Sequence, residues 1–196
     1  HARMATPGEK LLLLNEQTVE VYPDVLAITD ASGTIGLAGI MGGDSTKADE
    51  GTRHVFLESA FFFPQAIAGR ARRYNFTSDA SHRFERGVDF ENNVDGIERA
   101  TKLIMDICAG EPGPTEYMVA RLPKRKPVAM RVARAQKVIG IPVAAKDMGG
   151  VFKRLGFAHK SKNQSFVVTP PSYRFDIAIE EDLIEEVARV HGFERI

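Results

Sequence analysis

The sequence contains no tryptophan and a single cysteine, Cys108, among its 196 residues. One cysteine cannot form an internal disulfide, so a reducing, cytoplasmic setting is expected. No run of about 18 apolar residues occurs, which excludes a transmembrane helix, and the first residues include no apolar stretch long enough for a signal peptide. The dinucleotide-binding fingerprint GxGxxG and the Lys-Ser/Thr of a P-loop are also absent.

Hydrophobic residues make up 43% of the chain and charged residues 27%, as in typical globular proteins, which excludes disorder. The net charge is zero, but residues 1–120 carry 11 Lys/Arg against 18 Asp/Glu, and residues 121–196 carry 15 against 8. This opposite charge predicts two modules. The basic residues crowd into 121–162, which leaves two interpretations open: a nucleic-acid or acidic partner, or a solvated surface.

Apolar runs separated by turn residues predict a first module with several strands and two helices. We expect a hairpin of strands 11–14 and 19–21, further strands at 25–28, 35–41 and 54–60, and helices at 64–70 and 92–109. The second helix has apolar residues at spacings of three and four, which form one stripe along its length. It is expected to end at Gly110.

Prolines bracket the basic run 122–127, which is the best candidate for a linker. We therefore predict two domains, residues 1–120 and 121–196. In the second domain we expect strands at 128–132, 157–160 and 165–169 and helices at 134–139, 145–155 and 180–191. Helices followed by a two-strand ribbon indicate a small winged-helix-like module, so the predicted fold class is α+β.

The glycine-dense segment 39–43 lies at the end of a predicted strand. Glycines there allow either another backbone or a ligand to approach closely, and both interpretations remain open. Glu58 lies in an apolar run, where an unpaired carboxylate is costly to bury, so it needs a partner. That partner is either a hydroxyl or ammonium group of a ligand, or an arginine of the segment 70–73.

The polar segment 77–89 includes Ser78, Ser81 and His82. Neighbours in sequence seldom act together as a catalytic triad, and no distant histidine is an obvious base, so serine hydrolase chemistry is not favoured. The charged residues of the segment are instead expected to form ion pairs that fix a loop.

Four carboxylates gather around the start of the last predicted helix: Asp176, Asp182, Glu185 and Glu186. On a helix, Asp182 shares a face with Glu185 and Glu186, and the preceding loop brings Asp176 close. Oxygen ligands at this density suit Mg²⁺. The alternative is that acidic residues stabilise the helix N-terminus without a metal, and spacing alone leaves both open.

Several of these segments, in their order and spacing, resemble the bacterial phenylalanyl-tRNA synthetase β subunit family. They are 39–43 (GIMGG), 57–60 (LESA), 78–89 (SDASHRFERGVD), 171–176 (PSYRFD) and 181–189 (EDLIEEVAR). The resemblance extends over nearly the whole chain. It implies a mixed-sheet, N-terminally truncated B3/B4-like domain followed by a winged-helix-like B5 domain.

In this family the B3/B4 domain edits tyrosine wrongly attached to phenylalanine tRNA, and its pocket positions fall here on Gly42, Gly43, Glu58, Ser78 and Ala80. The family often has threonine where Ser78 stands, and a further pocket histidine is expected upstream of residue 1. We expect Glu58 to accept a hydrogen bond from the tyrosine hydroxyl. Backbone N–H groups near Gly42 and Gly43 are expected to face the developing oxyanion.

The resemblance also assigns these four carboxylates, on the last helix and the loop before it, to a Mg²⁺ site shared with an α subunit. We therefore expect this chain alone to bind Mg²⁺ only weakly, with the carboxylates solvated or paired with Arg174 or Arg189. Phenylalanine tRNA and the α subunit of an α2β2 heterotetramer are the implied partners, with no membrane. ATP is implied for the whole enzyme alone, and this chain is expected to hold no catalytic residue for aminoacylation.

Two other functions remain open. One is a nucleic-acid-binding adaptor that uses the basic segment 121–162. The other is a scaffold whose acidic last helix docks on another subunit. A deacylation assay with mischarged tRNA separates the editing function from both, and salt-dependent tRNA binding supports the adaptor, because phosphate contacts weaken as salt rises.

Overall fold

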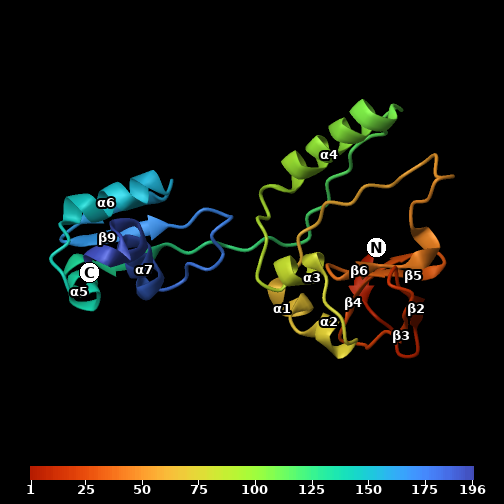
Figure 1. Cartoon of the computed structure of the whole chain (residues 1–196), viewed down its shortest axis with the longest axis horizontal. Coiled ribbons are helices and arrows are strands. Elements are labelled where there is room, and N and C mark those ends of the chain that lie inside the picture. The colour runs from red at the N-terminus through yellow and green to blue at the C-terminus, as the bar shows by residue number, and fades with distance from the viewer. The chain divides into compact units, whose positions relative to one another are not determined.

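The computed structural model describes all residues, 1–196, and divides the chain into two compact units (Figure 1). The N-terminal unit consists of His1–Val88 and Asn92–Gly113, and the C-terminal unit consists of Asp89–Glu91 and Pro114–Ile196. Each unit has a hydrophobic core of its own, and the α+β class is confirmed. None of the helices has the length and apolar character needed to cross a membrane.

The strands of the N-terminal unit form a four-stranded sheet, in the order β1-β4-β5-β6, and a separate hairpin, β2-β3. They are β1 (Ala2–Met4), β2 (Lys10–Leu12), β3 (Thr18–Glu20), β4 (Leu26–Asp30), β5 (Gly33–Leu37) and β6 (Met41–Gly42). The predicted hairpin is confirmed, with Leu11 opposite Val19. The expected mixed sheet is wrong: all pairings are antiparallel, because short turns join β4, β5 and β6 and leave no room for a crossover.

Two strand predictions differ from the structure. The predicted strand 35–41 is divided into β5 and β6 by a turn at Gly39, whose φ of +64° lies in the left-handed region that favours glycine. The predicted strand 54–60 is wrong, since residues 52–63 have no regular secondary structure. A strand needs a hydrogen-bonded neighbour, and neither edge of the sheet, β1 or β6, pairs with this segment.

Short helices follow this irregular segment. They are α1 (Pro64–Ile67), α2 (Arg70–Arg73) and α3 (Asp79–Phe84), preceded by the 3-10 turn η1 (Asp44–Thr46) and followed by α4 (Asn93–Cys108). Pro64 occupies the first turn of α1 as predicted, but Gly69, with a φ of +75°, separates α1 from α2. The segment 77–89 includes a helix, and one of its expected ion pairs is present, between Glu85 and Arg86 at 2.8 Å.

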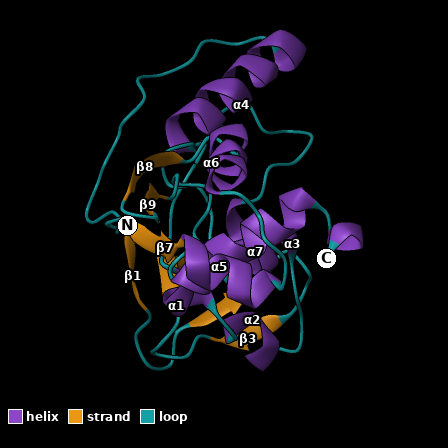
Figure 2. Cartoon of the chain, turned by 90° about the vertical axis from the view of Figure 1, so that its left-hand side faces the viewer, coloured by secondary structure: helices purple, strands orange, loops and turns teal.

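Helix α4 has the predicted apolar stripe but buries none of its residues. Val94, Leu103 and Ile107 are all exposed, Ile107 to 78%. In both ribbon views α4 lies apart from the strands of its own unit (Figure 1 and Figure 2). The stripe therefore contributes little to the core of this unit.

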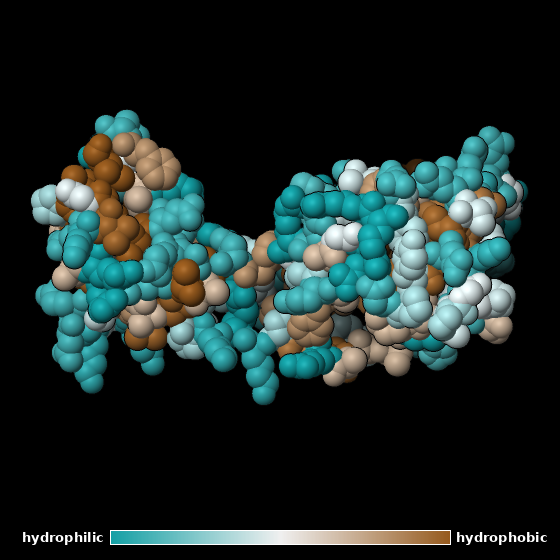
Figure 3. Space-filling view, turned by 90° about the horizontal axis from the view of Figure 1, so that it is seen from below, coloured by the Kyte–Doolittle hydropathy of each residue, from teal (hydrophilic) through white to brown (hydrophobic).

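The face of the molecule drawn in Figure 3 is mainly hydrophilic, with apolar areas between the hydrophilic side chains.

The C-terminal unit follows the predicted order of elements throughout. It comprises β7 (Val128–Arg131), α5 (Val132–Ile139), α6 (Ala145–Arg154), β8 (Ala158–Lys162), β9 (Ser165–Thr169), α7 (Glu180–His191) and the 3-10 turn η2 (Phe193–Arg195). Its sheet has the antiparallel order β7-β9-β8. Helices α5 and α7 pack on β7, and α6 packs on β8 (Figure 2). This arrangement matches the expected helices followed by a two-strand ribbon.

The core of the C-terminal unit forms where these helices meet the sheet. Phe152 and Met148 of α6, Met130 of β7, and Leu183 and Val187 of α7 are completely buried. The spacing of four between Leu183 and Val187 places both on one face of α7, and this face packs into the core of the C-terminal unit.

Limited proteolysis is expected to cleave the connection between the units first. Residues 109–119 have no regular secondary structure, and Tyr117 and Met118 are 62% and 89% exposed. Arg125, in contrast, donates hydrogen bonds to the carbonyls of Arg174 and Ile177, which ties that part of the predicted linker to the C-terminal unit. We therefore expect early chymotryptic cuts near 117–118, identified by mass spectrometry of the products. First cuts inside β7 to α7 would contradict the predicted division.

Candidate functional site

Ser78 connects the start of α3 to the glycine turn. Its Oγ donates a hydrogen bond to the backbone carbonyl of Ile40 at 2.6 Å and accepts one from the backbone N–H of Ser81 at 3.0 Å. The backbone N–H of Ser78 donates in return to the Ser81 hydroxyl, which completes a capping box. Gly42 and Ala80 lie on the two segments that Ser78 joins.

Two aromatic rings lie against the glycine turn, and the sequence did not indicate them. A Cβ at Gly39 would lie 3.1 Å from Phe84 and 3.2 Å from Phe62, whose ring centroids are 5.3 Å apart. Phe62 follows Glu58 by four residues, so the irregular segment 52–63 runs past this turn. Neither neighbour of Gly39 in the sequence is aromatic, so the sequence offered no local signal for this contact.

Gly42 and Gly43 differ in the space around them. Gly43 is buried, its N–H donates to the carbonyl of Ile35 at 2.8 Å, and a Cβ there would lie 2.6 Å from that oxygen. The expectation that the Gly43 N–H faces an oxyanion is therefore wrong, because it already belongs to the sheet. Gly42 is exposed, and a Cβ there would meet only Leu14, at 3.4 Å. Gly42 is the one that leaves room for a ligand.

Glu58 lies in the irregular segment and has no hydrogen-bond or ion-pair partner. Its expected burial within an apolar strand is wrong, because its side chain is exposed. Neighbouring protein atoms still desolvate the carboxylate in part, and this desolvation raises its pKa. The arginines of segment 70–73 pair with other acids: Arg70 and Arg73 bind Asp24, and Arg72 binds Glu85 at the C-terminal end of α3. An internal arginine partner for Glu58 is thereby excluded.

The four carboxylates near α7 do not converge on one point: one caps the helix, one is exposed and two bind the same arginine. Asp182 accepts hydrogen bonds from the backbone N–H groups of Ala178 and Ile179, at 2.7 and 2.9 Å, and so stabilises the start of the helix. Glu185 is exposed and has no hydrogen-bond partner. Asp176 and Glu186 both bind Arg174, as expected. No three acidic, histidine or cysteine side chains converge in a way that could hold a metal ion.

Glu186 is held by two arginines. Arg174 donates to its two oxygens at 2.9 and 3.0 Å, and Arg189 donates to the same oxygens at 2.6 and 3.2 Å. Burial opposes ionisation of Glu186, but these charge-assisted bonds outweigh it and lower its pKa. Arg174 also lowers the pKa of Asp176, which it contacts at 2.7 Å. Both carboxylates are therefore ionised and paired without a metal.

The basic segment 121–162 is partly neutralised within its own unit. Arg131 of β7 binds Glu180 of α7 at 2.6 Å, and Arg134 of α5 binds both Glu180 and Glu181. The clustering of charge along the sequence therefore reflects, in part, helices and strands of opposite charge that pack together.

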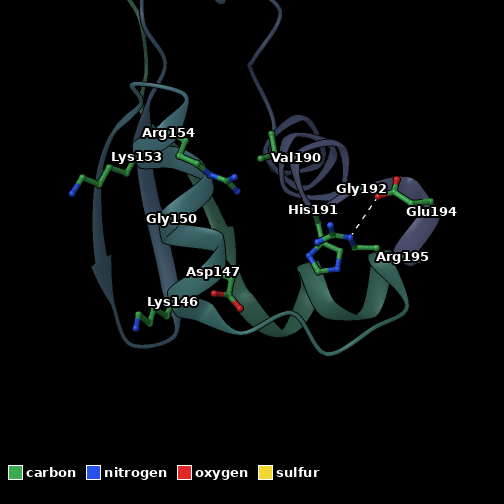
Figure 4. A pocket seen from close by; sticks show the side chains of 10 residues that line it. All are labelled: Lys146, Asp147, Gly150, Lys153, Arg154, Val190, His191, Gly192, Glu194 and Arg195. Carbon is green, nitrogen blue, oxygen red and sulfur yellow. Dashed lines mark ion pairs between the residues drawn. The ribbon is translucent and has the colours of Figure 1, made fainter.

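Unpaired basic side chains of this segment lie around an open pocket of about 750 Å³ between α6 and the end of α7 (Figure 4). Its lining consists of Lys146, Asp147, Gly150, Lys153, Arg154, Val190, His191, Gly192, Glu194 and Arg195. Figure 4 shows Arg154 and Asp147 extending toward the α7 side, whereas Lys146 and Lys153 extend away from it. Arg195 is paired with Glu194 at 3.5 Å. The pocket thus carries both signs of charge.

Comparison with known protein families identifies both units. Residues 1–109 match the family model described as the B3/4 domain. The chain belongs to the B3/4 domain family. Residues 128–193 match a second model, described as the tRNA synthetase B5 domain, so the two models follow one another along the chain. The resemblance stated from the sequence motifs is confirmed.

Curated relatives match over the entire chain. The phenylalanine–tRNA ligase beta subunit of Dechloromonas aromatica is 56% identical over 196 residues, which is all of this chain and 25% of the relative. That of Ralstonia nicotianae is 55% identical over 194 residues, or 99% of this chain and 24% of the relative. The chain therefore spans about a quarter of the length of the relatives it matches.

A solved structure, an N-terminal fragment of the phenylalanyl-tRNA synthetase beta subunit from Pyrococcus horikoshii, is 11% identical to this chain. The match covers 97% of this chain and 55% of that chain, with a TM-score of 0.46. This likeness is too weak to show a common fold.

The B3/4 match includes the glycine turn, Glu58 and the start of α3, whereas the B5 match includes α7 and the lining of the pocket of Figure 4 apart from Glu194 and Arg195. The editing positions Gly42, Glu58, Ser78 and Ala80 thus lie within the B3/4 domain and stay predictions. The sequence did not indicate Arg125 as a contact of the B5 domain.

Proposed function

We propose that this chain is part of a phenylalanine–tRNA ligase β subunit and that its B3/4 domain takes part in hydrolytic editing of tyrosine esterified to phenylalanine tRNA. The proposal rests on one observation above others: the two family models occur in order on a chain that is 56% identical throughout to a β subunit. The ligation reaction, with its ATP, belongs to the complete enzyme. Phenylalanine tRNA and an α subunit are the partners that this proposal implies.

The editing role is supported by the arrangement around Gly42. The exposed glycine lies beside a turn that Ser78 fixes to α3, so the backbone there is held in place without a side chain above it. Glu58 has no partner of its own and is partly desolvated. A carboxylate without a partner can accept a hydrogen bond from a hydroxyl group, and a hydroxyl is the one group that distinguishes tyrosine from phenylalanine.

In the proposed reaction, water attacks the carbonyl carbon of the tyrosyl ester, the bond to the ribose oxygen of the tRNA breaks, and that oxygen receives a proton. The products are tyrosine and uncharged tRNA. The Gly42 backbone offers close approach to the ester, and Glu58 holds the phenol end of the amino acid. Ser78 positions the turn, since its hydroxyl is engaged with the Ile40 carbonyl.

Glu58→Ala, made in the full-length β subunit, is expected to reduce the preference for tyrosyl over phenylalanyl ester by about 5- to 150-fold. The physical reason is the loss of one hydrogen bond between the partly desolvated carboxylate and the tyrosine hydroxyl, worth about 1 to 3 kcal/mol. The measurement compares deacylation rates of phenylalanine tRNA charged with each amino acid. Glu50→Ala, which removes another exposed carboxylate of the same loop region, is the matched control. Equal discrimination in both variants would remove Glu58 from the proposed role.

A second candidate function is favoured by the pocket of the B5 domain. Lys146, Lys153 and Arg154 have no acidic partner and lie along one helix, α6 (Figure 4). They could attract the phosphates of a nucleic acid, but Asp147 lies among them. Binding of tRNA that weakens steeply with salt and depends on these three side chains would favour this role.

A further inference from the structure

Glu186 is the only buried charged side chain of the chain, with 4% of its surface exposed. Its two oxygens accept four hydrogen bonds from Arg174 and Arg189, which fills the acceptor capacity of a carboxylate. A buried carboxylate satisfied in this way has no free oxygen lone pair left for a metal ion.

Arg174 lies at the centre of the cluster. Its Nε and Nη2 donate to Asp176 while its two terminal nitrogens donate to Glu186, so one guanidinium bridges both acids. The Cζ atom of Arg174 also lies 5.4 Å from the centre of the Phe157 ring. A Mg²⁺ ion needs oxygen ligands at about 2.0–2.1 Å on all sides. The guanidinium of Arg174 already fills the space between Asp176 and Glu186.

The backbone around Arg174 is also held. Arg125 donates to the carbonyls of Arg174 and Ile177, at either end of the loop that carries Asp176. Displacement of Arg174 would therefore disturb the loop and the start of the chain segment that leads into the B5 domain.

We propose that Arg174 is the resident cation of this cluster, and that the chain takes up no divalent ion at Asp176 and Glu186 while Arg174 is in place. The four carboxylates that the family resemblance assigns to Mg²⁺ do not fit that ion in this chain. Asp182 is used as a helix cap, Glu186 is saturated by arginines, and Glu185 stands alone at the surface. This inference does not depend on the editing function.

The test uses the whole chain and two variants, Arg174→Gln and the control Arg154→Gln, which removes an arginine with no acidic partner in the same domain. Thermal unfolding and calorimetric titration are followed with MgCl2 up to about 10 mM, against NaCl of equal ionic strength. Wild type and control are expected to show no stoichiometric heat and no shift specific to Mg²⁺. Arg174→Gln is expected to lower the unfolding midpoint by about 8 °C or more, because the buried Glu186 loses one of its two arginine counter-charges and Asp176 loses its arginine partner.

Addition of Mg²⁺ is then expected to recover part of that loss in Arg174→Gln alone, because Asp176 and Glu186 have lost the cation that bridged them. Stoichiometric Mg²⁺ binding by the wild type that disappears in Glu186→Gln would overturn the proposal. An Arg174→Gln chain that gains nothing from Mg²⁺ would overturn it as well.

If Arg174→Gln does not fold, an NMR experiment on the wild-type chain still tests the proposal. Equimolar Mn²⁺, a paramagnetic substitute for Mg²⁺, is expected to leave the amide NMR signals of residues 176–186 as sharp as those of β9. Selective broadening of these signals would overturn the proposal.

Discussion

Gly42→Trp in the full-length β subunit is expected to reduce deacylation of tyrosyl-tRNA to background while leaving aminoacylation nearly intact. The indole would occupy the space that the exposed glycine leaves open beside the turn, where a Cβ meets only Leu14. The aminoacylation site is not expected on this chain, so the ligation rate is a readout that the pocket does not touch. Both rates are measured on the same preparation, with tyrosyl-tRNA for the first and phenylalanine and tRNA for the second.

Two alanine variants, at Gly42 and at the neighbouring Gly43, are the controls for this experiment. Gly42→Ala adds a Cβ at ordinary contact distance, 3.4 Å from Leu14, and is expected to keep the fold and most of the deacylation activity. Gly43→Ala places a Cβ 2.6 Å from the backbone oxygen of Ile35, which cannot move aside without breaking the sheet, and is expected to destabilise the domain. Parallel loss of deacylation and ligation in Gly42→Trp would indicate misfolding and count against the pocket.

Phe152→Ala is expected to lower the unfolding free energy of the B5 domain by about 3 to 5 kcal/mol. Phe152 is completely buried, and its ring contacts those of Phe166 and Phe157, with centroids 5.4 and 6.4 Å away. Truncation leaves a cavity between α6 and the sheet that the stiff β-strands cannot close. Hydrogen exchange of the amides of α7 measures this loss, since they are protected by the same core.

Val138→Ala on α5 is the matched comparison, because that side chain is 56% exposed. It is expected to change the unfolding free energy by less than about 0.5 kcal/mol. Amides of the B3/4 domain, which has a core of its own, are expected to keep their protection in both variants. Equal effects of Phe152→Ala and Val138→Ala would contradict the position of the core.

The B5 domain could be predicted from the sequence almost element by element. Each of its helices has a clear apolar face, such as that of Leu183 and Val187 on α7, and each finds its partner within the domain. Local pattern and tertiary packing therefore agree. The first module was harder: the hairpin β2-β3 and helix α4 were predicted correctly, but the apolar run 54–60 forms no strand because no strand lies beside it.

The candidate sites show the same division. The apolar neighbours of Glu58 predicted a buried carboxylate with a partner, but the structure leaves its side chain exposed and pairs the arginines of 70–73 with other acids. Spacing placed Asp182 and Glu186 on one helix, but it could not distinguish a metal ligand from a helix cap or an arginine-bound anion. Whether a carboxylate acts as a metal ligand, a helix cap or an arginine-bound anion depends on which groups from other elements lie next to it.

The sequence by itself determined the two-module order, the B5 elements and the family, because hydrophobic periodicity, turn residues and motif spacing are local properties. Tertiary structure alone decided that Gly43 belongs to the sheet while Gly42 is open, and that Arg174 occupies the carboxylate cluster. These outcomes depend on contacts between residues such as Ile35 and Gly43, or Arg174 and Glu186, whose distances in space are set by the packing of whole elements. A hydrogen-bonding group has a small, fixed number of donor and acceptor positions, and the fold decides which partners fill them.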